Sequence, residues 1–473
     1  MSRAIHSLLT LAVTVSICIC LPLVAHGQGI SSNPEAASIF QQGLDAYEDG
    51  DYGMASRRFQ IALNSYPLHD KTTAAWIMAG KALYLAGDYD DAADILDDLI
   101  QTYPASRYAS EALALVTYAR EMQMAGSDRE SINLGILLPM DGDARSLTQS
   151  IFDGIHLAVN DFNSSPGAGD LKVRMVFRES SGDSTQTTRS VRELVDEDVH
   201  LFIGPLYSQE ALTAAAVAEQ ERIVMIAPLA TDEEVSEDRD YVYQANPTLE
   251  MRGRLMARMA VTGLRHERFG VIAEFDNAVS ERMAEGFQDE IRVLGGEIDF
   301  VDLLPGSNSW FRLQDRLIPD SLLNIDAIYM PIAGGNAPTL VKGALDSFDR
   351  MGVPVRILGN KEFHDLPSKS QPSTYHTVYT TDFLLDPENA ALELFKLRYA
   401  GLEQGEPTTL TYVGYDVTRF VLQQLLGERD VRKALDRSGF YQGLGVRINF
   451  AGGHVNEAMY YLRYRNAELE VIR

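Results

Sequence analysis

Residues 201–231 read LFIGPLYSQEALTAAAVAEQERIVMIAPLAT and decide the fold of the larger part of this chain. Leu201–Ile203 is a short apolar strand that runs into a Gly-Pro turn, and a helix opened by Ser208 follows. A second apolar strand, Ile223–Ala227, ends in a loop of small residues. Strand, turn, helix and strand predict a parallel α/β unit. Ligands bind at the carboxyl ends of the strands in such sheets, so we expect a binding site at these loops.

The same alternation of strands and helices extends to both sides of this stretch. Further apolar strands are expected at 132–138, 173–177, 269–274, 298–304, 327–332 and 355–358, most of them followed by a helix. The pattern restarts after residue 246, which predicts two similar α/β lobes with parallel sheets and helices on both faces. A strand at 377–383 is expected to return toward the first lobe. Residues 446–450 and 459–463 are expected to form a hairpin-like end.

The N-terminal part, residues 34–125, is predicted to be all helical. Gly50-Asp51-Tyr52 recurs as Gly87-Asp88-Tyr89, an offset of 37 residues, and Ala55, Phe59 and Pro67 recur at the same offset as Ala92, Leu96 and Pro104. An internal period of this length indicates a helical solenoid. Tyr47, Tyr52, Tyr84 and Tyr89 are interpreted as packing between repeats rather than as ligand contacts.

The composition excludes several classes of function. The formal net charge is −26, with 41 Lys and Arg against 67 Asp and Glu, and this repels nucleic acid and anionic lipid. The sequence contains no HExxH, G-x-S-x-G, Walker A or G-x-G-x-x-G set in its proper context. We therefore predict no catalytic residues, no metal site and no cofactor, and expect a binding protein rather than an enzyme.

Residues 1–27 resemble a secretory signal peptide. An apolar stretch at 8–24 is followed by Ala25-His26-Gly27, which places small residues where a signal peptidase cleaves. The alternative is an uncleaved membrane anchor, for which the stretch is short. Both cysteines, Cys18 and Cys20, lie in this leader and follow isoleucines, whereas a lipoprotein signal has a small residue there. We expect a periplasmic protein without a lipid anchor.

Residues 131–473 resemble the type I periplasmic binding proteins, in particular the leucine and branched-chain amino acid group. The segments that carry the resemblance are NLGILLPMDGDARSLTQSIFDGIHLAVNDFN, IGPLYSQEA, IVMIAPLAT and GLGVRINFAGGHVNEAMYYLRY. It implies two lobes joined by three crossovers, with a ligand in the cleft between them. The first lobe is expected at 132–245 and 378–440, and the second at 246–376 and 441–473. The crossovers are expected near 244–247, 376–381 and 439–445.

The resemblance also implies which loops contact the ligand. The candidate ligand-binding residues are Ser208, Thr231, Ala230, Tyr207, Asp141, Asn277 and Glu362. Ser208 and Thr231 would hold a ligand carboxylate, because a helix N-terminus and a hydroxyl donate hydrogen bonds. Each candidate also has a structural interpretation: Ser208 is suited to cap its helix, Thr231 to form a turn, and Asp141 to precede a tight turn at a glycine.

Residues 34–125 resemble the tetratricopeptide repeat, which implies a docking or spacer module. The leading hypothesis is a periplasmic solute-binding protein that closes on an amino acid or a related carboxylate and is recognised by a membrane transporter or a sensor. The alternative is an envelope protein that binds a partner through the helical repeats. The fusion of the two domains resembles the outer-membrane activators of peptidoglycan synthases, and it favours this alternative.

Overall fold

The structure is a computed structural model that describes residues 32–66, 68–125, 131–139, 145–165, 171–180, 183–400, 405–426 and 430–472. Its internal contacts divide the chain into two compact units, Met1–Ser127 and Asp128–Arg473, called here the helical unit and the α/β unit. The predicted leader, residues 1–27, lies outside the described residues, as does the candidate residue Asp141. Among the residues described, no helix has the length and apolar character needed to cross a membrane.

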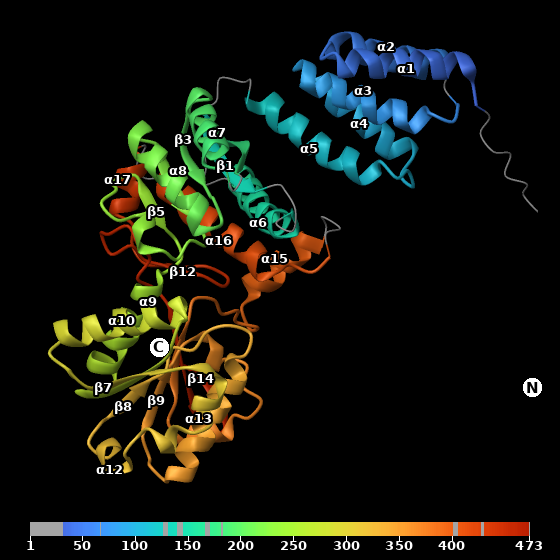
Figure 1. The fold of residues 1–473 in the computed structure, drawn as a ribbon. Helices are drawn as coiled ribbons and strands as arrows, with labels where there is room; N and C mark the ends of the chain where they lie inside the picture. The colour runs from blue at the N-terminus through green and yellow to red at the C-terminus, as the bar shows by residue number, and fades with distance from the viewer. Residues whose placement is uncertain are drawn as a thin grey trace, which may run out of the picture. The chain divides into compact units, whose positions relative to one another are not determined.

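The helical unit consists of helices arranged in antiparallel pairs (Figure 1). They are α1 (Pro34–Glu48), α2 (Tyr52–Ser65), α3 (Thr72–Ala86), α4 (Tyr89–Thr102) and α5 (Ala109–Ala125). Asn33 caps α1 by accepting hydrogen bonds from two backbone N–H groups, and Asp51 caps α2 in the same way through one. Gly87 ends α3 in the left-handed conformation, with φ of 87°.

The predicted repeat is visible in the packing of the helical unit. The rings of Tyr47 and Tyr52 lie 5.4 Å apart at 67°, and those of Tyr84 and Tyr89, 37 residues later, lie 5.4 Å apart at 64°. A Cβ on Gly43 would lie 2.6 Å from the Phe59 ring, and one on Gly80 would lie 2.4 Å from Leu96. The glycines and the tyrosine pairs therefore occupy equivalent positions in two successive helical hairpins. The prediction of an all-α repeat region is confirmed.

The first lobe of the α/β unit is built on a five-stranded parallel sheet in the order β2-β1-β3-β4-β5. The strands are β1 (Ser131–Pro139), β2 (Lys172–Ser180), β3 (Val199–Ile203), β4 (Val224–Ala227) and β5 (Val242–Gln244). One face packs against α6 (Arg145–Ser164), α16 (Thr409–Leu425) and α17 (Val431–Asp436). The other packs against α7 (Ser184–Asp196) and α8 (Ser208–Glu221). Apolar residues on both faces explain why these strands read as unbroken hydrophobic runs.

The second lobe is built on a seven-stranded sheet in the order β14-β13-β10-β9-β8-β6-β7. Its strands are β6 (Arg268–Glu274), β7 (Glu297–Leu304), β8 (Ala327–Tyr329), β9 (Arg356–Gly359), β10 (Val378–Thr381), β13 (Tyr460–Arg465) and β14 (Glu468–Ile472). The parallel part, β7-β6-β8-β9-β10, repeats the strand order of the first lobe. Helices α9 (Leu249–Arg258) and α10 (Ala278–Val293) cover one face, and α13 (Ala337–Met351) covers the other. The predicted two-lobed α/β fold is confirmed.

Each lobe contains a pair of helices that cross at glycines. In the first lobe, a Cβ on Gly154 of α6 would lie 2.0 Å from the Thr411 carbonyl oxygen of α16. In the second lobe, a Cβ on Gly253 of α9 would lie 2.0 Å from the Met283 carbonyl oxygen of α10. Such backbone contact leaves no room for a side chain at either crossing. The pairs α6–α16 and α9–α10 thus share the same kind of close helix crossing in the two lobes.

Two of the predicted crossovers and one predicted pairing are wrong in detail. The strand expected to return to the first lobe is β10, and it pairs with β9 and β13 in the second sheet, so the chain crosses after it, at 382–385. Residues 446–450 pack in the first-lobe core, so the third crossover falls at 451–459. β11 (Tyr441–Gln442) pairs with β12 (Arg447–Ile448), and β13 pairs with β14, so no hairpin joins 446–450 to 459–463. The alternation of strands and helices in the sequence locates the strands, but it does not show which strands pair with one another.

Candidate functional site

A cavity of about 330 Å³ lies between the two lobes of the α/β unit. It is lined from the first lobe by Pro228, Leu229, Thr231, Thr409, Leu410, Val413 and Val446, from the crossovers by Ala245, Asn246, Pro247, Asp382, Phe383 and Asn456, and from the second lobe by Leu249, Arg252, Val279, Met283, Ala333, Asn360, Lys361 and Glu362. Because the loops after β4, β5, β9 and β10 all reach it, the cavity lies at the carboxyl ends of both sheets. This is the place where open α/β sheets bind ligands.

The first-lobe wall of the cavity is mostly apolar. Leu410 and Val413 come from the first turns of α16, and Val446 comes from the loop before β12. That loop is held by Asp416, whose buried carboxylate accepts backbone N–H bonds at 2.8–2.9 Å from residues 444–446. Burial raises the pKa of Asp416 to about 6, against the three backbone donors that lower it. A buried carboxylate therefore fixes the position of one apolar wall.

Arg252 of α9 is the most buried charge of the cavity, with 8% of its side chain exposed. Its Nη2 donates to Asp382 Oδ2 at 2.6 Å and to Asn246 Oδ1 at 2.9 Å, and its Nε donates to the Pro247 carbonyl at 3.2 Å. Burial would raise the pKa of Asp382, but the charges of Arg252 and Lys361 outweigh it and hold that pKa below its usual range. Arg252 therefore joins the first two crossovers through an ion pair that faces the cavity.

Lys361 and Glu362 follow β9 and have charges of opposite sign side by side. Among the residues described, neither side chain has a hydrogen-bond or ion-pair partner, and Lys361 is exposed. Burial raises the pKa of Glu362, and nearby carboxylates including Asp382 add to the rise, while Lys361 opposes it. The preceding Asn360 is 6% exposed; its Nδ2 donates to the Ile332 carbonyl at 2.7 Å, and its Oδ1 has no partner among described atoms. Polar groups in this loop remain available to a ligand.

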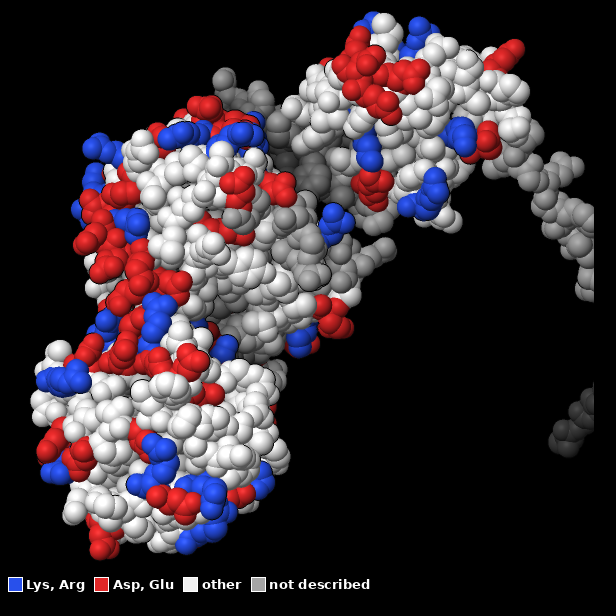
Figure 2. Space-filling model, viewed as in Figure 1, with Lys and Arg blue, Asp and Glu red and all other residues white. Residues whose placement is uncertain are grey.

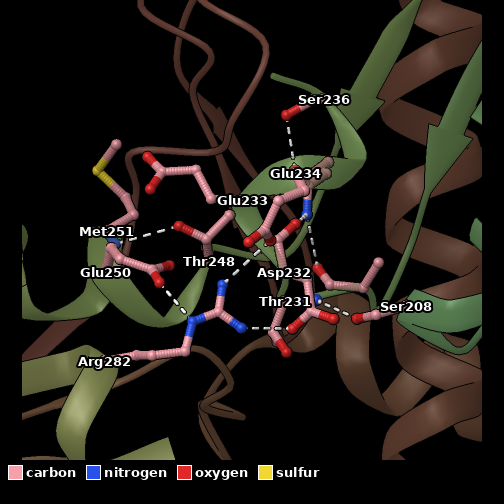
Figure 3. Close-up of polar contacts among 12 residues, drawn as sticks. Ser208, Thr231, Asp232, Glu233, Glu234, Ser236, Thr248, Glu250, Met251 and Arg282 are labelled. Atoms are coloured by element: carbon pink, nitrogen blue, oxygen red, sulfur yellow. Dashed lines mark hydrogen bonds and ion pairs between the residues drawn. The ribbon is translucent and has the colours of Figure 1, made fainter. Parts of the chain in front are cut away.

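Of the candidate residues of the first lobe that the structure describes, only one lines the cavity. Thr231 lines the cavity, whereas Ser208 does not: its hydroxyl accepts the Thr231 backbone N–H at 3.2 Å (Figure 3). Tyr207, not Ser208, is the N-cap of α8; it is 46% exposed and outside the cavity lining. The Ala230 side chain is buried in the first-lobe core, and its carbonyl accepts a hydrogen bond from Gln244. Ser208 thus holds the loop that carries Thr231, and it neither caps its helix nor faces the cavity.

The candidate residues of the second lobe also differ in whether they line the cavity. Glu362 lines the cavity, but Asn277 is the N-cap of α10 and accepts the Ser280 N–H at 3.4 Å. Asp141 lies between β1 and α6 in the sequence, outside the described residues. Sequence reasoning missed Arg252, Asn360 and Asp382. The available signals were Asp382, a charge inside the apolar strand expected at 377–383, and Arg252 on a helix face with the apolar Leu249 and Leu255.

The α/β unit matches a known family along its whole length. A family model described as periplasmic binding protein matches residues 131–468, more than half of the chain, and the chain therefore belongs to that family. A second model, described as outer membrane lipoprotein, matches residues 32–180, which include helices α1–α5 and extend into the first lobe of the α/β unit.

Similar proteins and structures agree with this family. The leucine-specific-binding protein of Salmonella typhimurium is 24% identical over 217 residues, which is 46% of this chain and 57% of that protein. The Leu/Ile/Val-binding protein BraC3 of Rhizobium johnstonii is 20% identical over 242 residues, 50% of this chain and 61% of that protein. The chain thus spans about three fifths of the length of these curated relatives.

Solved structures show the same fold for the α/β unit. A structure described as a branched-chain amino acid ABC transporter from Rhodospirillum rubrum has a TM-score of 0.59 and 21% identity, and covers 72% of this chain and 100% of that chain. An ABC transporter substrate-binding protein from Desulfitobacterium hafniense in complex with Leu has a TM-score of 0.51 and 18% identity, with the same coverage. The curated relatives are named as binding proteins, and the family model is one of periplasmic binding proteins.

Proposed function

We propose that the α/β unit closes its two lobes on a small zwitterionic solute, an amino acid or a related carboxylate, in the periplasm. The bound form would deliver the solute to a membrane transporter or signal to a sensor. The observation that carries the proposal is the cavity between the lobes, which presents free charges of both signs beside an apolar wall. Its volume of about 330 Å³ is at the small end of the range for ligand pockets.

The chemistry of the lining suits the three parts of an amino acid. Lys361 offers a cation for the carboxylate, and the Thr231 hydroxyl offers a further donor to it. Glu362 offers a carboxylate for the ammonium group. Leu410 and Val413 offer an apolar surface for a side chain, which agrees with relatives named for leucine, isoleucine and valine.

Lobe closure follows from the same geometry. A solute that contacts Thr231 in one lobe and Glu362 in the other binds more tightly when the lobes are close, and so favours the closed state. A transporter or sensor that contacts both lobes can then distinguish the loaded protein from the empty one.

The experiment is a thermal unfolding panel of the mature chain with amino acids and small carboxylates. A solute that binds only the native state at a hundred times its Kd adds about 2.7 kcal/mol, which raises the unfolding midpoint by several degrees. Glu362→Gln should reduce the rise, and Glu468→Gln, an exposed carboxylate of β14, should leave it unchanged. No rise with any amino acid or carboxylate would contradict the proposal.

A second candidate function rests on the match of residues 32–180 to an outer membrane lipoprotein family. In this proposal the helical repeats dock an envelope partner, and the α/β unit makes protein contacts as well, as in the outer-membrane activators of peptidoglycan synthases. Affinity purification from envelope extracts should recover the same partner with the full chain and lose it when residues 28–125 are deleted. Recovery of that partner without the helical unit would exclude the repeats as its docking site.

A further inference from the structure

Arg282 on α10 contacts three carboxylates at once. Its Nη1 donates to Asp232 at 2.6 Å, its Nη2 lies 3.5 Å from Glu234, and its Nε pairs with Glu250 (Figure 3). The Arg282 side chain is 23% exposed, and that of Glu250 is 14% exposed. Paired carboxylates raise the pKa of Arg282 against the effect of its burial, so the guanidinium remains charged. An arginine with three carboxylates forms an ion-pair network, which is worth more than an isolated surface pair.

The three carboxylates come from different lobes. Asp232 and Glu234 follow β4 of the first lobe, whereas Glu250 and Arg282 belong to α9 and α10 of the second. A further pair, Arg254 Nη1 to Glu233 at 2.6 Å, joins the same two parts. Figure 2 shows acidic side chains mixed with basic ones where the two lobes meet. We call residues 232–234 the acidic segment; on the side of this segment, ion pairs connect the lobes.

The acidic segment continues directly into the cavity wall. Thr231 lines the cavity, its N–H donates to Ser208, and its carbonyl accepts the Leu249 N–H at 3.1 Å. Gln244 Nε2 of β5 donates to the Asp232 carbonyl at 3.0 Å, and this hydrogen bond holds the segment against the first lobe. On the other side, Met283 lines the cavity next to Arg282. A change in the ion pairs therefore reaches the cavity walls of both lobes through adjacent residues.

We propose that Arg282 is a positioning residue of the cleft, which sets the angle between the lobes without contacting the solute. With Arg282 removed, Asp232 and Glu250 would lose the guanidinium that pairs with both of them across the lobes, while Arg254 remains paired with Glu233. Like charges that share a counter-ion repel each other once it is removed, and Glu250 Oε2 is already buried without a hydrogen-bond partner among the described atoms. The lobes would therefore separate at this side of the cleft. The effect on the lobe angle is independent of the proposed function, and only the effect on solute affinity rests on it.

The test measures the distance between the lobes in the full, ligand-free chain. Spin labels on Asp196→Cys of α7 and Leu323→Cys after α12 (Pro319–Leu322) report on the first and second lobes, with Cys18 and Cys20 replaced by serine. Arg282→Gln should give a longer and broader distance distribution in pulsed electron resonance, and Arg282→Lys should restore most of the original one.

A matched control lies on the same helix. Arg292 of α10 pairs with Asp289 three residues before it, within one lobe, so Arg292→Gln makes the same charge change without touching the lobe junction. It should leave the distance distribution unchanged. If Arg282→Gln does not fold, Asp232→Asn with Glu234→Gln removes the two ion pairs of Arg282 that cross between the lobes. It should also lengthen the distance, but by less, because the attraction across the junction is lost and no repulsion between carboxylates is added. Distributions identical to wild type in the folded variants would overturn the proposal.

Solute affinity is the second readout and separates the two proposals. If an amino acid binds, Arg282→Gln should weaken binding about tenfold, which is a typical coupling between sites, and Arg292→Gln less than twofold. A longer lobe distance with no amino acid bound by any variant would uphold the role of Arg282 and contradict the proposed function. An unchanged distance together with normal binding would contradict the role of Arg282 and uphold the function.

Discussion

The two lobes of the α/β unit share one strand order but use equivalent loops differently. β4 and β9 occupy the same place in the orders β2-β1-β3-β4-β5 and β7-β6-β8-β9-β10. The loop after β4 carries Thr231, whose N–H is held by Ser208. The loop after β9 carries Lys361 and Glu362, neither of which has an ion-pair partner among the described residues.

The loops after β5 and β10 are also equivalent, and both contribute to one ion-pair cluster. Asn246 follows β5, Asp382 follows β10, and both accept hydrogen bonds from Arg252. The comparison teaches that topology and chemistry are specified separately. Buried apolar strands fix the same framework twice, while a few polar residues at loop positions give the second lobe the unpaired charges on which the proposed solute recognition rests.

The largest effect is expected where the two lobes are most alike. Gly154→Ala and Gly253→Ala each place a methyl group 2.0 Å from a carbonyl oxygen of the partner helix, which cannot move without displacing the helix. Each should lower the free energy of unfolding by about 3 kcal/mol or more, measured by chemical denaturation. Gly335→Ala and Gly439→Ala meet no atom within 4 Å and serve as controls. If only one of the two glycine variants lost much stability, the two helix pairs would not be equivalent.

A smaller effect is expected where the lobes differ in charge. Arg252→Met leaves the carboxylate of Asp382 without its ion-pair partner, with only the weaker effect of the Lys361 charge, and should cost about 2 kcal/mol at neutral pH, since both side chains are mostly buried. Because the pKa of Asp382 is lowered in the native protein, this stabilisation is present above the usual aspartate range and is lost as pH falls through the lowered pKa. The difference between wild type and variant should therefore shrink in acid. Arg312→Met, in an exposed pair with Asp315, should cost almost nothing at either pH.

The smallest effect is expected from the first-lobe hydroxyl that supports the loop after β4. Ser208→Ala removes the acceptor of the Thr231 N–H and should lower the free energy of unfolding by about 1 kcal/mol. Solute affinity should fall several-fold, because Thr231 lines the cavity and its position relaxes. Ser150→Ala on the exposed face of α6 is the control. Complete loss of binding in Ser208→Ala would mean that its hydroxyl contacts the solute directly, contrary to the structure.

The framework could be read from the sequence, but the assignment of some strands to sheets could not. Runs such as Leu201–Ile203 are buried on both faces of a sheet, and this leaves a local signal of continuous apolar residues. The strand β10 was equally visible, yet its partners β9 and β13 lie far apart in the chain, and no local pattern encodes which sheet it joins. The error in the second crossover follows directly from this.

The candidate site was predictable only in part, for a related reason. Glu362 and Thr231 are predicted because the resemblance to the binding-protein family places ligand contacts in the loops after these strands, and both line the cavity. Arg252 was missed because an arginine on a helix usually faces solvent, and its partner Asp382 lies 130 residues later in the chain. The resemblance and the position of Ser208 at a helix start predict a ligand contact, whereas its hydroxyl accepts a hydrogen bond from the Thr231 N–H, 23 residues away in the chain.

The most direct test is a calorimetric titration of the wild type and Glu362→Gln with an amino acid and with its N-acetyl derivative. The wild type should bind the free amino acid at least tenfold more tightly, since only the ammonium group can pair with Glu362. This preference should weaken as pH falls through the raised pKa of Glu362, and it should be largely absent in the variant at every pH. Equal affinity for the two compounds in the wild type, or binding of neither, would contradict a cleft in which the second lobe recognises a zwitterionic solute.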